Sequence, residues 1–567
     1  MLSLAGSGLS GLHRMTKMQV RWPWGRLWHE RAIAAIAAIA TVVALVVPER
    51  VLAQSNGSSF TDLASLGRLL KVAAQRPVMR CRELVATGAP SYTVLTAEPA
   101  GGPGVAGSVC RVHGAVPLEL EFMLELPNPW NGRLYVLGNG GYAGESVTGD
   151  YGMAERTRAM AVGFAVMFTN LGHDRVREPG TDWARNSFAK KLDYAVRGLH
   201  TTTTIAKDIA RLYYGRRVQR SYFDGCSTGG GQALKAAQRF PADYDGIVGG
   251  APVFDFVQLQ LYGWNNQMAV LNTPLSREKV ALLGQRIMDL FDAQDGVKDG
   301  VIENPLAIDF DPVRDLPHAG PLGPGFTDAE LSALSRIYRG TFLDGRQLAP
   351  GVPVGAESLG QVYATADFGF APPESGWATR LVPDRQGHMQ QRANVEGWLK
   401  YLAFEQDDPD MDITRFDPGR DLPRMQVMSS IMDAADPDLG DFKARGGKMI
   451  LYHGWADVGV NPIMTVRYYE KIQRTMGKGV DRFVRLFMVP GMFHCRGGLN
   501  VDRFDAAATV IAWVERGEVP ERIIGTRIED GKVVRTRPLC PYPQVARYKG
   551  IGGTDNASSF SCELSGP

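Results

Sequence analysis

The sequence predicts an α/β fold, in which a mostly parallel sheet carries helices on its faces and a large insertion interrupts the core. Two observations lead to this prediction. Short apolar runs alternate with amphipathic runs between residues 119 and 250, as strands and helices alternate around a parallel sheet. From about Phe254 to Arg445 the chain becomes rich in Pro, Asp and Gly, with helical pieces and no clear run of strands, before the strand pattern returns.

The core is predicted in two parts, residues 54–253 and 446–567, with a lid insertion at residues 254–445. Three strand-like runs, separated by Asn-Pro, Asn-Gly and Gly-Gly breaks, cover Glu119–Leu126, Arg133–Leu137 and Gly163–Thr169. A long amphipathic helix, a strand, a helix and a strand follow at Leu192–Tyr214, Arg220–Phe223, Gly230–Arg239 and Gly246–Gly250. The second part adds two buried strands and a closing helix at Lys448–Tyr452, Phe483–Val489 and Ala506–Arg516.

Length and charge limit the possible functions. A chain of 567 residues is too long for one compact core, so we expect two structural units or one large domain with an insertion. The 62 Lys and Arg residues nearly balance the 60 Asp and Glu residues, so the totals give no sign of a polyanion-binding surface. We therefore expect no nucleic-acid partner.

The N-terminus has the pattern of a signal peptide. Three arginines precede the apolar run Ala32–Val47, and a small-residue cleavage site follows between Ala53 and Gln54. A membrane anchor is the alternative, but the run is shorter than the ~20 residues that a spanning helix needs. A buried core helix fits poorly beside the Ser/Gly-rich stretch that follows. We expect residues 1–53 to be removed and the mature protein to be periplasmic or extracellular, without stable membrane insertion.

The cysteines agree with export. All six lie after the predicted cleavage site, at Cys81, Cys110, Cys226, Cys495, Cys540 and Cys562. An even number in an exported chain predicts disulfides, and the lack of a CxxC pair speaks against zinc binding and thiol redox chemistry. The count alone leaves the pairing open.

A serine nucleophile is predicted at Ser227. Gly225–Gly229 matches the G-x-S-x-G pattern of a nucleophile elbow, in which glycines flank a serine on a tight, strained turn. The context supports this interpretation, because a predicted strand precedes the pattern and a predicted helix follows it. A Gly-rich turn with a solvated serine is the alternative.

Such a serine needs a base, and the base needs a carboxylate that orients it. In α/β-hydrolases the chain order is serine, acid, histidine. Asp457 and His494 each follow a predicted buried strand beyond the insertion, which is where these partners are expected. His453 is a rival base, but it precedes Asp457 by four residues on one loop and fits the order badly. His173 is predicted to support the site or to be a structural histidine.

A tetrahedral intermediate needs preformed N–H donors. Thr228, directly after the predicted nucleophile, supplies one from its backbone, and the Gly-rich run Leu137–Tyr142 is the candidate for the second. A phosphate-binding loop is rejected for that run, because it lacks GxGxxG and a following Lys-Ser/Thr.

Two cysteines flank these predicted catalytic residues. Cys226 precedes the predicted nucleophile and Cys495 follows the predicted base. A bond between them would fix the catalytic geometry across the long insertion. Two unpaired buried thiols are the alternative, which an oxidising compartment disfavours.

The segment Asp292–Val301 packs three carboxylates and two glycines into ten residues. Hard oxygen ligands on a tight loop suit calcium. The spacing is not that of an EF-hand, and a solvated acidic turn is the alternative.

Several separate motifs, in order, resemble the tannase and feruloyl esterase family, which includes the mono(2-hydroxyethyl) terephthalate hydrolases. They are Gly225–Gly230, Asp245–Pro252, Asp292–Pro305, Pro490–Cys495 and Thr536–Pro543. The resemblance covers essentially all of the chain after the leader and is weakest between about Pro312 and Asp436. It implies a secreted serine carboxylesterase with an α/β-hydrolase core, and a lid inserted after the strand that follows the nucleophile helix.

The resemblance also implies roles for single residues. It maps the catalytic triad onto Ser227, Asp457 and His494, and the second oxyanion donor onto Gly141. The cysteines pair, by the same likeness, as Cys81–Cys110, Cys226–Cys495 and Cys540–Cys562.

By the same resemblance, the acidic loop is a structural calcium site in the lid. Its implied ligands are the side chains of Asp292, Asp295 and Asp299 and the backbone carbonyls of Val297 and Val301. Family members often carry two cysteines around this loop where this chain has the apolar Phe291 and Ile308. We therefore expect the loop to lack this disulfide and to bind calcium with lower affinity.

The implied substrate is a small aromatic ester with a hydroxycinnamoyl or galloyl group. No arginine is securely placed to match the one that binds the terephthalate carboxylate, and Thr228 stands where the terephthalate enzymes carry an acidic residue. Trp377, Trp398 and Tyr401 either line an aromatic pocket or belong to the core. A terephthalate monoester hydrolase, a serine peptidase and a non-catalytic, calcium-stapled binding protein on the same fold are the alternatives.

Overall fold

The structure is a computed structural model that describes residues 66–67, 70, 74–101, 108–320, 325–357, 376–383 and 389–565. The predicted signal peptide and its cleavage site lie outside these residues. The described residues all belong to one unit, Gln54–Pro567.

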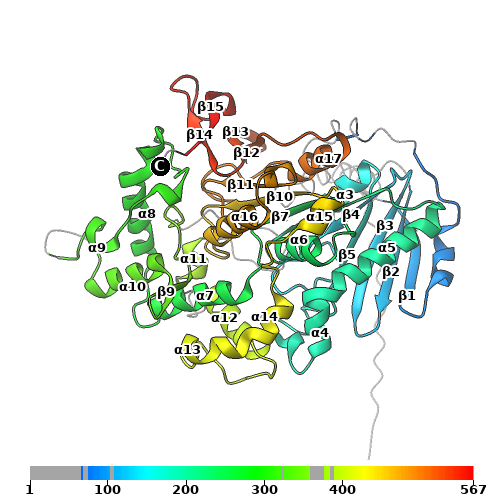
Figure 1. The fold of residues 1–567 in the computed structure, drawn as a ribbon, viewed down its shortest axis with the longest axis horizontal. Helices are drawn as coiled ribbons and strands as arrows, with labels where there is room; N and C mark the ends of the chain where they lie inside the picture. Colours follow the sequence, from blue (N-terminus) through cyan, green and yellow to red (C-terminus); the bar gives the residue numbers. More distant parts are fainter. Residues whose placement is uncertain are drawn as a thin grey trace, which may run out of the picture. The chain divides into compact units, whose positions relative to one another are not determined.

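A nine-stranded mixed sheet forms the centre of this unit (Figure 1). In spatial order its strands are β1 (Thr93–Ala100), β2 (Ser108–Val116), β3 (Leu120–Asn128), β5 (Ala165–Thr169), β4 (Arg133–Leu137), β6 (Arg220–Cys226), β7 (Gly246–Gly250), β10 (Lys448–Gly454) and β11 (Val484–Val489). The first three strands and their junction with β5 are antiparallel, and every pairing from β5 to β11 is parallel. The predicted α/β-hydrolase core is therefore confirmed.

Helices cover both faces of the parallel strands. Successive strand residues enter different hydrophobic clusters, as Ile247 and Val248 do on β7, because side chains alternate across a strand. One cluster includes residues of α5 (Gly198–Tyr214), α6 (Thr228–Arg239) and α16 (Pro462–Met476), and the other includes residues of α3 (Met153–Ala161) and α17 (Ala506–Arg516). Strands buried on both faces read as continuous apolar runs, which is why the sequence predicted them well.

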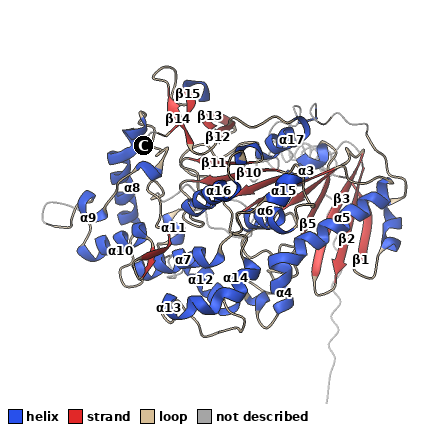
Figure 2. Cartoon of the chain, in the orientation of Figure 1, coloured by secondary structure: helices blue, strands red, loops and turns tan. Residues whose placement is uncertain are grey.

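The predicted lid lies between β7 and β10 in the chain and is mostly helical in its described part (Figure 2). Its helices are α7 (Phe256–Val270), α8 (Arg277–Phe291), α9 (Pro312–Asp315), α10 (Asp328–Arg339), α11 (Trp377–Arg380), α12 (Gln390–Tyr401), α13 (Pro418–Asp421), α14 (Gln426–Met432) and α15 (Gly440–Ala444). A short hairpin of β8 (Thr341–Leu343) and β9 (Arg346–Ala349) was not predicted. At the base of the lid, Ala434 N donates to Phe254 O at 2.7 Å, which joins the two ends of the insertion.

The long helix predicted over Leu192–Tyr214 is interrupted. The chain forms α4 (Phe188–Leu192), one π-helical turn over Asp193–Arg197, and then α5. A Cβ at Gly198 would lie 2.7 Å from Asp193 O, so glycine permits the close approach at the wide turn. The Asp193–Arg197 ion pair also lies within it. Periodicity alone does not separate a helix from a helix with one π turn.

The C-terminal part carries four strands that the sequence analysis did not predict. They form two hairpins, β12 (Ile523–Glu529) with β13 (Lys532–Leu539), and β14 (Gln544–Tyr548) with β15 (Phe560–Leu564). Several of their apolar side chains are exposed, including Val533 and Leu564, so the burial pattern that reveals core strands is weak here.

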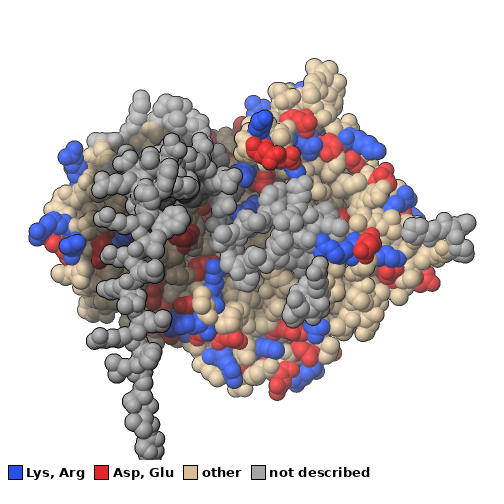
Figure 3. Space-filling view, turned by 180° about the vertical axis from the view of Figure 1, so that it is seen from behind, with Lys and Arg blue, Asp and Glu red and all other residues tan. Residues whose placement is uncertain are grey.

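The three disulfides join Cys81 to Cys110, Cys226 to Cys495 and Cys540 to Cys562, which confirms the implied pairing. On the face seen in Figure 3, basic and acidic side chains are interspersed. Within the described ranges, no helix is both long and apolar enough to cross a membrane.

Candidate active site

Ser227 lies at the turn between β6 and α6, with φ 65° and ψ −119°. A non-glycine residue rarely adopts this backbone conformation, and a residue held there indicates stored strain at a functional turn. The turn is fixed by packing, since a Cβ at Gly225 would lie 2.7 Å from the Cα of Gly229 and one at Gly230 would lie 2.2 Å from Gly250 O. The glycines of the motif are therefore needed for the close approach of α6 to the strand ends, as the nucleophile-elbow prediction requires.

Asp457 and His494 meet beyond the carboxyl ends of β10 and β11. His494 Nδ1 lies 2.6 Å from Asp457 Oδ2. The second carboxylate oxygen, Oδ1, accepts from the backbone N–H groups of Gly459 at 2.8 Å and Val460 at 2.9 Å. The Asp457 side chain is fully buried, whereas that of His494 is 20% exposed. A buried carboxylate held by two backbone N–H groups thus contacts a histidine that remains accessible.

The charge of Asp457 is strongly stabilised. Burial by itself raises the pKa of its carboxyl group, but the positive charge of His494 and hydrogen bonds from His453 and His494 outweigh burial and hold the pKa well below its usual range. An opposite charge and hydrogen bonds to the ionised form both favour ionisation. Asp457 is therefore anionic throughout the neutral range, as an orienting acid must be.

The Cys226–Cys495 disulfide brings the serine and the histidine together. It joins the residue before Ser227 to the residue after His494, with the two cysteine Cα atoms 6.0 Å apart. The bond spans 269 residues of sequence, including the whole lid. The three predicted triad residues are thus gathered at one edge of the sheet.

The run 138–141 packs against the start of α6. Gly229 N donates to Asn139 O at 2.8 Å, and the hydroxyl of Thr228 donates to Gly141 O. Gly141 has a positive φ of 55°, which glycine adopts without steric cost. The two predicted oxyanion residues, Gly141 and Thr228, are therefore in direct contact.

A buried carboxylate that the sequence analysis missed supports this run. Glu145 is fully buried and accepts from Asn139 Nδ2 at 2.8 Å and from Gly140 N at 3.0 Å. On the other side of Asn139, Gln232 of α6 both accepts from its backbone and donates to its side chain. Burial raises the pKa of Glu145, although these hydrogen bonds oppose the shift in part. No motif marks Glu145, because its role depends on contacts made only in the folded chain.

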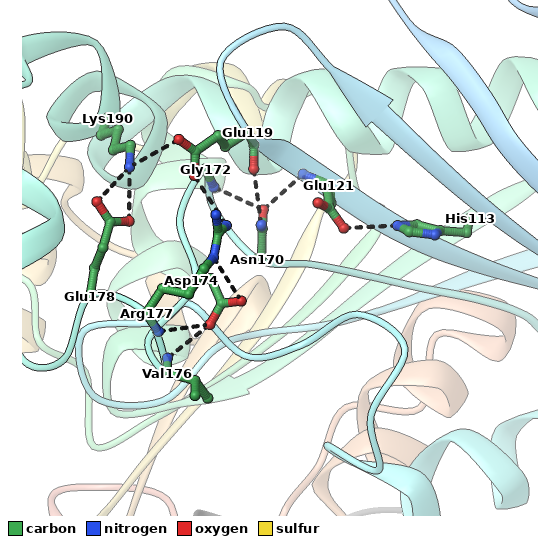
Figure 4. Close-up of polar contacts among 10 residues, drawn as sticks. All are labelled: His113, Glu119, Glu121, Asn170, Gly172, Asp174, Val176, Arg177, Glu178 and Lys190. Atoms are coloured by element: carbon green, nitrogen blue, oxygen red, sulfur yellow. Dashed lines mark hydrogen bonds and ion pairs between the residues drawn. The ribbon is translucent and has the colours of Figure 1, made fainter. Parts of the chain in front are cut away.

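The loop 170–178 contacts Gly144 through its backbone and is tied to the start of β3 (Figure 4). The side-chain oxygen of Asn170 accepts from the N–H groups of Glu121 at 2.8 Å and Gly172 at 2.9 Å. Lys190 of α4 bridges Glu119 and Glu178, at 3.4 and 2.8 Å. The loop also exchanges backbone hydrogen bonds with Gly144 through Asn170 O and Arg175 N. The loop therefore supports the segment that directly follows the Gly-rich run.

The chain is similar in sequence and in fold to several known proteins. Residues 104–563 match the family model described as "Tannase and feruloyl esterase". A mono(2-hydroxyethyl) terephthalate hydrolase of Piscinibacter sakaiensis is 33% identical over 512 residues, 80% of this chain and 84% of the relative. A probable feruloyl esterase of Arthroderma benhamiae is 30% identical over 470 residues, 77% of this chain and 81% of the relative. The crystal structure of feruloyl esterase B from Aspergillus oryzae superposes with a TM-score of 0.70 at 25% identity, over 85% of this chain and 99% of that one.

The chain belongs to the tannase and feruloyl esterase family. It is therefore a carboxylic ester hydrolase, and the resemblance drawn from its motifs is confirmed.

In this family member, His173 lies in the loop behind the Gly-rich run and not among the triad residues. It is fully buried and stacks on Trp183 with ring centroids 4.3 Å apart. Both ring nitrogens are buried without a hydrogen-bond partner among the described residues. Burial lowers the pKa of the imidazole to about 4. The placement agrees with a supporting or structural histidine.

The lid touches both loops of the site. Tyr142, next to Gly141, donates through its hydroxyl to Asn394 O in α12 at 3.0 Å. On the acid side, Tyr262 of α7 donates to Val458 O at 3.0 Å. Arg380 of α11 lies against the same loop, since a Cβ at Gly459 would be 2.8 Å from its guanidinium. The predicted lid thus places a cation beside Asp457, the predicted orienting acid.

The lid aromatics singled out from the sequence are core residues. Trp377, Trp398 and Tyr401 are 0, 3 and 9% exposed and belong to the main hydrophobic cluster. Phe291 and Ile308, which replace the family's additional cysteines, pack against the same cluster. Apolar packing therefore holds the acidic loop where other members are expected to have a disulfide.

The acidic loop shows some features of a cation site. Asp292 accepts from the N–H groups of Asp299, Gly300 and Val301, so it closes the loop on itself. No group of three or more His, Cys, Asp or Glu side chains converges as a metal site within the described ranges. Nevertheless, a cavity of about 10 Å³ is lined by Asp295, Val297, Asp299, Val301 and Glu303, among others.

The negative charge at this cavity is only partly compensated. Asp299 Oδ1 is buried without a hydrogen-bond partner among the described residues, although Arg537 pairs with Oδ2. Burial, with repulsion from Asp299 and Asp292, raises the pKa of Asp295 to about 6. Hard oxygen ligands with uncompensated charge suit calcium. The residues present therefore fit a cation that two side chains and two backbone carbonyls would hold.

Proposed function

We propose that this protein is an exported serine esterase in which Ser227, His494 and Asp457 hydrolyse aromatic carboxylic esters through an acyl-enzyme. Ser227 Oγ attacks the ester carbonyl carbon while His494 Nε2 takes the hydroxyl proton. The backbone N–H groups of Gly141 and Thr228 stabilise the oxyanion. His494 then gives its proton to the leaving alcohol, and water releases the acid by the same steps.

One observation carries this proposal. The Asp457–His494 contact of 2.6 Å belongs to a histidine that the Cys226–Cys495 bond ties to the strained Ser227 turn. Nucleophile, base and orienting acid on three strand-end loops are the requirement for acyl transfer. The test is turnover of p-nitrophenyl acetate by the wild type and by Ser227→Ala. Turnover by the variant near the wild-type rate would contradict the mechanism.

The acyl group is proposed to be hydroxycinnamoyl or galloyl. The support is the family, the probable feruloyl esterase among its relatives and the large insertion that contacts both loops of the site. A ring that fills a mostly apolar site gains about 1–3 kcal/mol over one that does not. The test is a panel of kcat/KM values for methyl ferulate, methyl gallate, a terephthalate monoester and a butyrate ester. A butyrate ester with the highest value would contradict the aromatic preference.

A terephthalate monoester is the second candidate, and Arg380 favours it. The Arg380 side chain is half-buried beside Gly459, and desolvation lowers the pKa of its guanidinium. A partly desolvated cation near the site would pair with a substrate carboxylate. If this candidate is correct, Arg380→Ala should lower kcat/KM for the terephthalate monoester at least tenfold more than for methyl ferulate. Equal losses on both esters would exclude it.

Calcium is proposed as a structural cofactor of the lid. Asp295 and Asp299 through side chains, and Val297 and Val301 through carbonyls, would hold it, with Asp292 closing the loop or joining the ligands. Bound calcium stabilises the folded state by mass action and would take no part in the chemistry. Elemental analysis of freshly purified protein should find one calcium per chain.

Export is proposed from the leader pattern and from the three disulfides, which persist in oxidising compartments. The mature chain is expected to begin at Gln54. N-terminal sequencing of the protein recovered outside the cytoplasm tests this, and an intact leader would contradict it.

A further inference from the structure

A second histidine contacts the acid of the proposed triad. His453 lies on β10, four residues before Asp457, and both side chains are fully buried. His453 Nε2 is 3.1 Å from Asp457 Oδ2, the oxygen that also contacts His494. The other ring nitrogen, Nδ1, is 2.8 Å from the hydroxyl of Thr465 in α16.

The contacts determine which nitrogen of His453 carries the proton. Nε2 faces two oxygens that can only accept, Asp457 Oδ2 and the carbonyl of Val460 at 3.0 Å. Nε2 must therefore be the N–H donor. The Thr465 hydroxyl can donate to an unprotonated Nδ1, so the contacts of both ring nitrogens are satisfied by the Nε2–H tautomer. A hydroxyl that donates to one ring nitrogen also strengthens the N–H on the other.

Three further titratable groups lie around this pair. The titratable groups that face Asp457 are His494 on the neighbouring loop, Tyr262 on α7 and Arg380 on α11. Two of these carry or acquire positive charge, and Asp457 is the acidic group that they share.

We infer that His453 is a positioning residue for the base: it donates to the Asp457 oxygen that orients His494, and Thr465 holds it in the tautomer that can do so. The inference rests on the proposed function, since it assigns His494 as the base. In this arrangement Asp457 Oδ2 is shared between the Nε2–H group of His453 and the imidazole of His494. His453 thereby fixes the carboxylate plane and tempers its attraction for the proton on His494.

The first test compares two substitutions of one residue. His453→Leu removes the donor at similar volume, whereas His453→Gln can still donate from its amide. The leucine variant should lose kcat about 10- to 100-fold, as expected when a hydrogen bond to a charged group is lost. Its acid limb of kcat/KM should move to higher pH by roughly 0.5–1 unit, because Asp457 then stabilises the His494 imidazolium more strongly. The glutamine variant should lose less and shift less.

A matched control and a second position keep the test decisive. His200→Leu removes another histidine–aspartate contact, in which His200 of α5 lies 2.7 Å from Asp243, and should leave the acid limb in place. Thr465→Val should move the limb in the same direction as His453→Leu but by less, and Thr465→Ser should restore it. If His453→Leu fails to fold, the Thr465 pair decides.

The outcomes separate this inference from the proposed function. An acid limb unmoved in both His453→Leu and Thr465→Val would overturn the positioning role, even with Ser227→Ala and His494→Ala inactive. If His453→Gln were as inactive as His494→Ala, His453 would be the base and the inference would also fall. A fully active Ser227→Ala would instead overturn the proposed function itself.

Discussion

Two carboxylates in this molecule, Asp457 and Asp433, have pKa values shifted in opposite directions. At the candidate active site, Asp457 receives four hydrogen bonds, two from backbone N–H groups and two from histidines. At the base of the lid, Asp433 lies near a second carboxylate, Asp255, and receives one backbone N–H from Phe256 and the Ser429 hydroxyl. Burial raises the pKa of Asp433 to about 7, with repulsion from Asp255 adding to it.

The contrast shows that burial does not by itself decide the charge of a carboxylate. Burial is the largest influence at both sites and raises the pKa at both. Only at Asp457 do cationic partners and donors outweigh it, so only there is a permanent anion built into the fold. The lid base has instead a carboxyl pair whose charge depends on pH.

The largest expected effect comes from removing the negative charge of Asp457. Asp457→Asn keeps the shape but favours the wrong His494 tautomer, so kcat should fall by roughly 10⁴-fold, as in other Ser-His-Asp triads. The loss should be measured with p-nitrophenyl acetate, beside a thermal melt that shows the variant is folded. A loss below tenfold would mean that Asp457 is not the orienting acid.

The pH dependence should report His494 alone. Because the folded-state pKa of Asp457 is depressed, its contribution to stability is present above the unfolded pKa near 4 and is lost only as pH falls through the lower folded value. The acid limb of kcat/KM between pH 5 and 8 should therefore fit a single ionisation. A limb with two protons in that range would show that Asp457 also titrates.

The next-largest effect is expected from removing the disulfide that joins the Ser227 turn to the His494 loop. The double variant Cys226→Ser/Cys495→Ser opens a loop of 269 residues, for which chain-entropy models give about 5 kcal/mol of lost stability. Activity should fall at temperatures where the protein is still folded. The control is Cys540→Ser/Cys562→Ser, which removes the bond between the C-terminal strands and should leave kcat unchanged. Equal activity in both double variants would contradict a positioning role for the first bond.

A smaller effect is expected from calcium removal. Chelation should lower the melting temperature and raise KM more than it lowers kcat, because the loop belongs to the lid and not to the triad. Asp299→Asn should lower the melting temperature and abolish the response to added calcium. The exposed Asp289→Asn on α8 should behave like the wild type. Identical melting curves with and without chelator would contradict a structural calcium in the lid.

The smallest expected effect is the contribution of Asp433, at the base of the lid, to the pH dependence of stability. Because the folded-state pKa of Asp433 is raised to about 7, its contribution to stability is full below the unfolded pKa near 4 and is lost as pH rises through 7. The wild-type melting temperature should fall by about 1–2 °C between pH 5 and 7.5 from this group. Asp433→Asn keeps an oxygen for Phe256 N and should flatten the profile. A variant profile as steep as the wild type would show that another group is responsible.

The sequence by itself determined the parts of this protein that depend on local pattern. Strands buried on both faces, such as β7, are continuous apolar runs, and the Ser227 elbow needs glycines at fixed positions. The acid and the histidine were predictable because the carboxyl ends of parallel strands meet at one edge of the sheet, so chain order places Asp457 and His494 together. The calcium ligands stay a prediction from the family likeness.

Only the tertiary structure decided which distant groups complete the site. Glu145 behind the Gly-rich run, Arg380 beside the acid loop and Thr465 on His453 carry no motif, since each acts through contacts across long separations or from a neighbouring helix. The same is true of charge: Asp457 and Asp433 are alike as letters in a sequence. Their opposite pKa shifts arise from the donors and cations that folding brings to each.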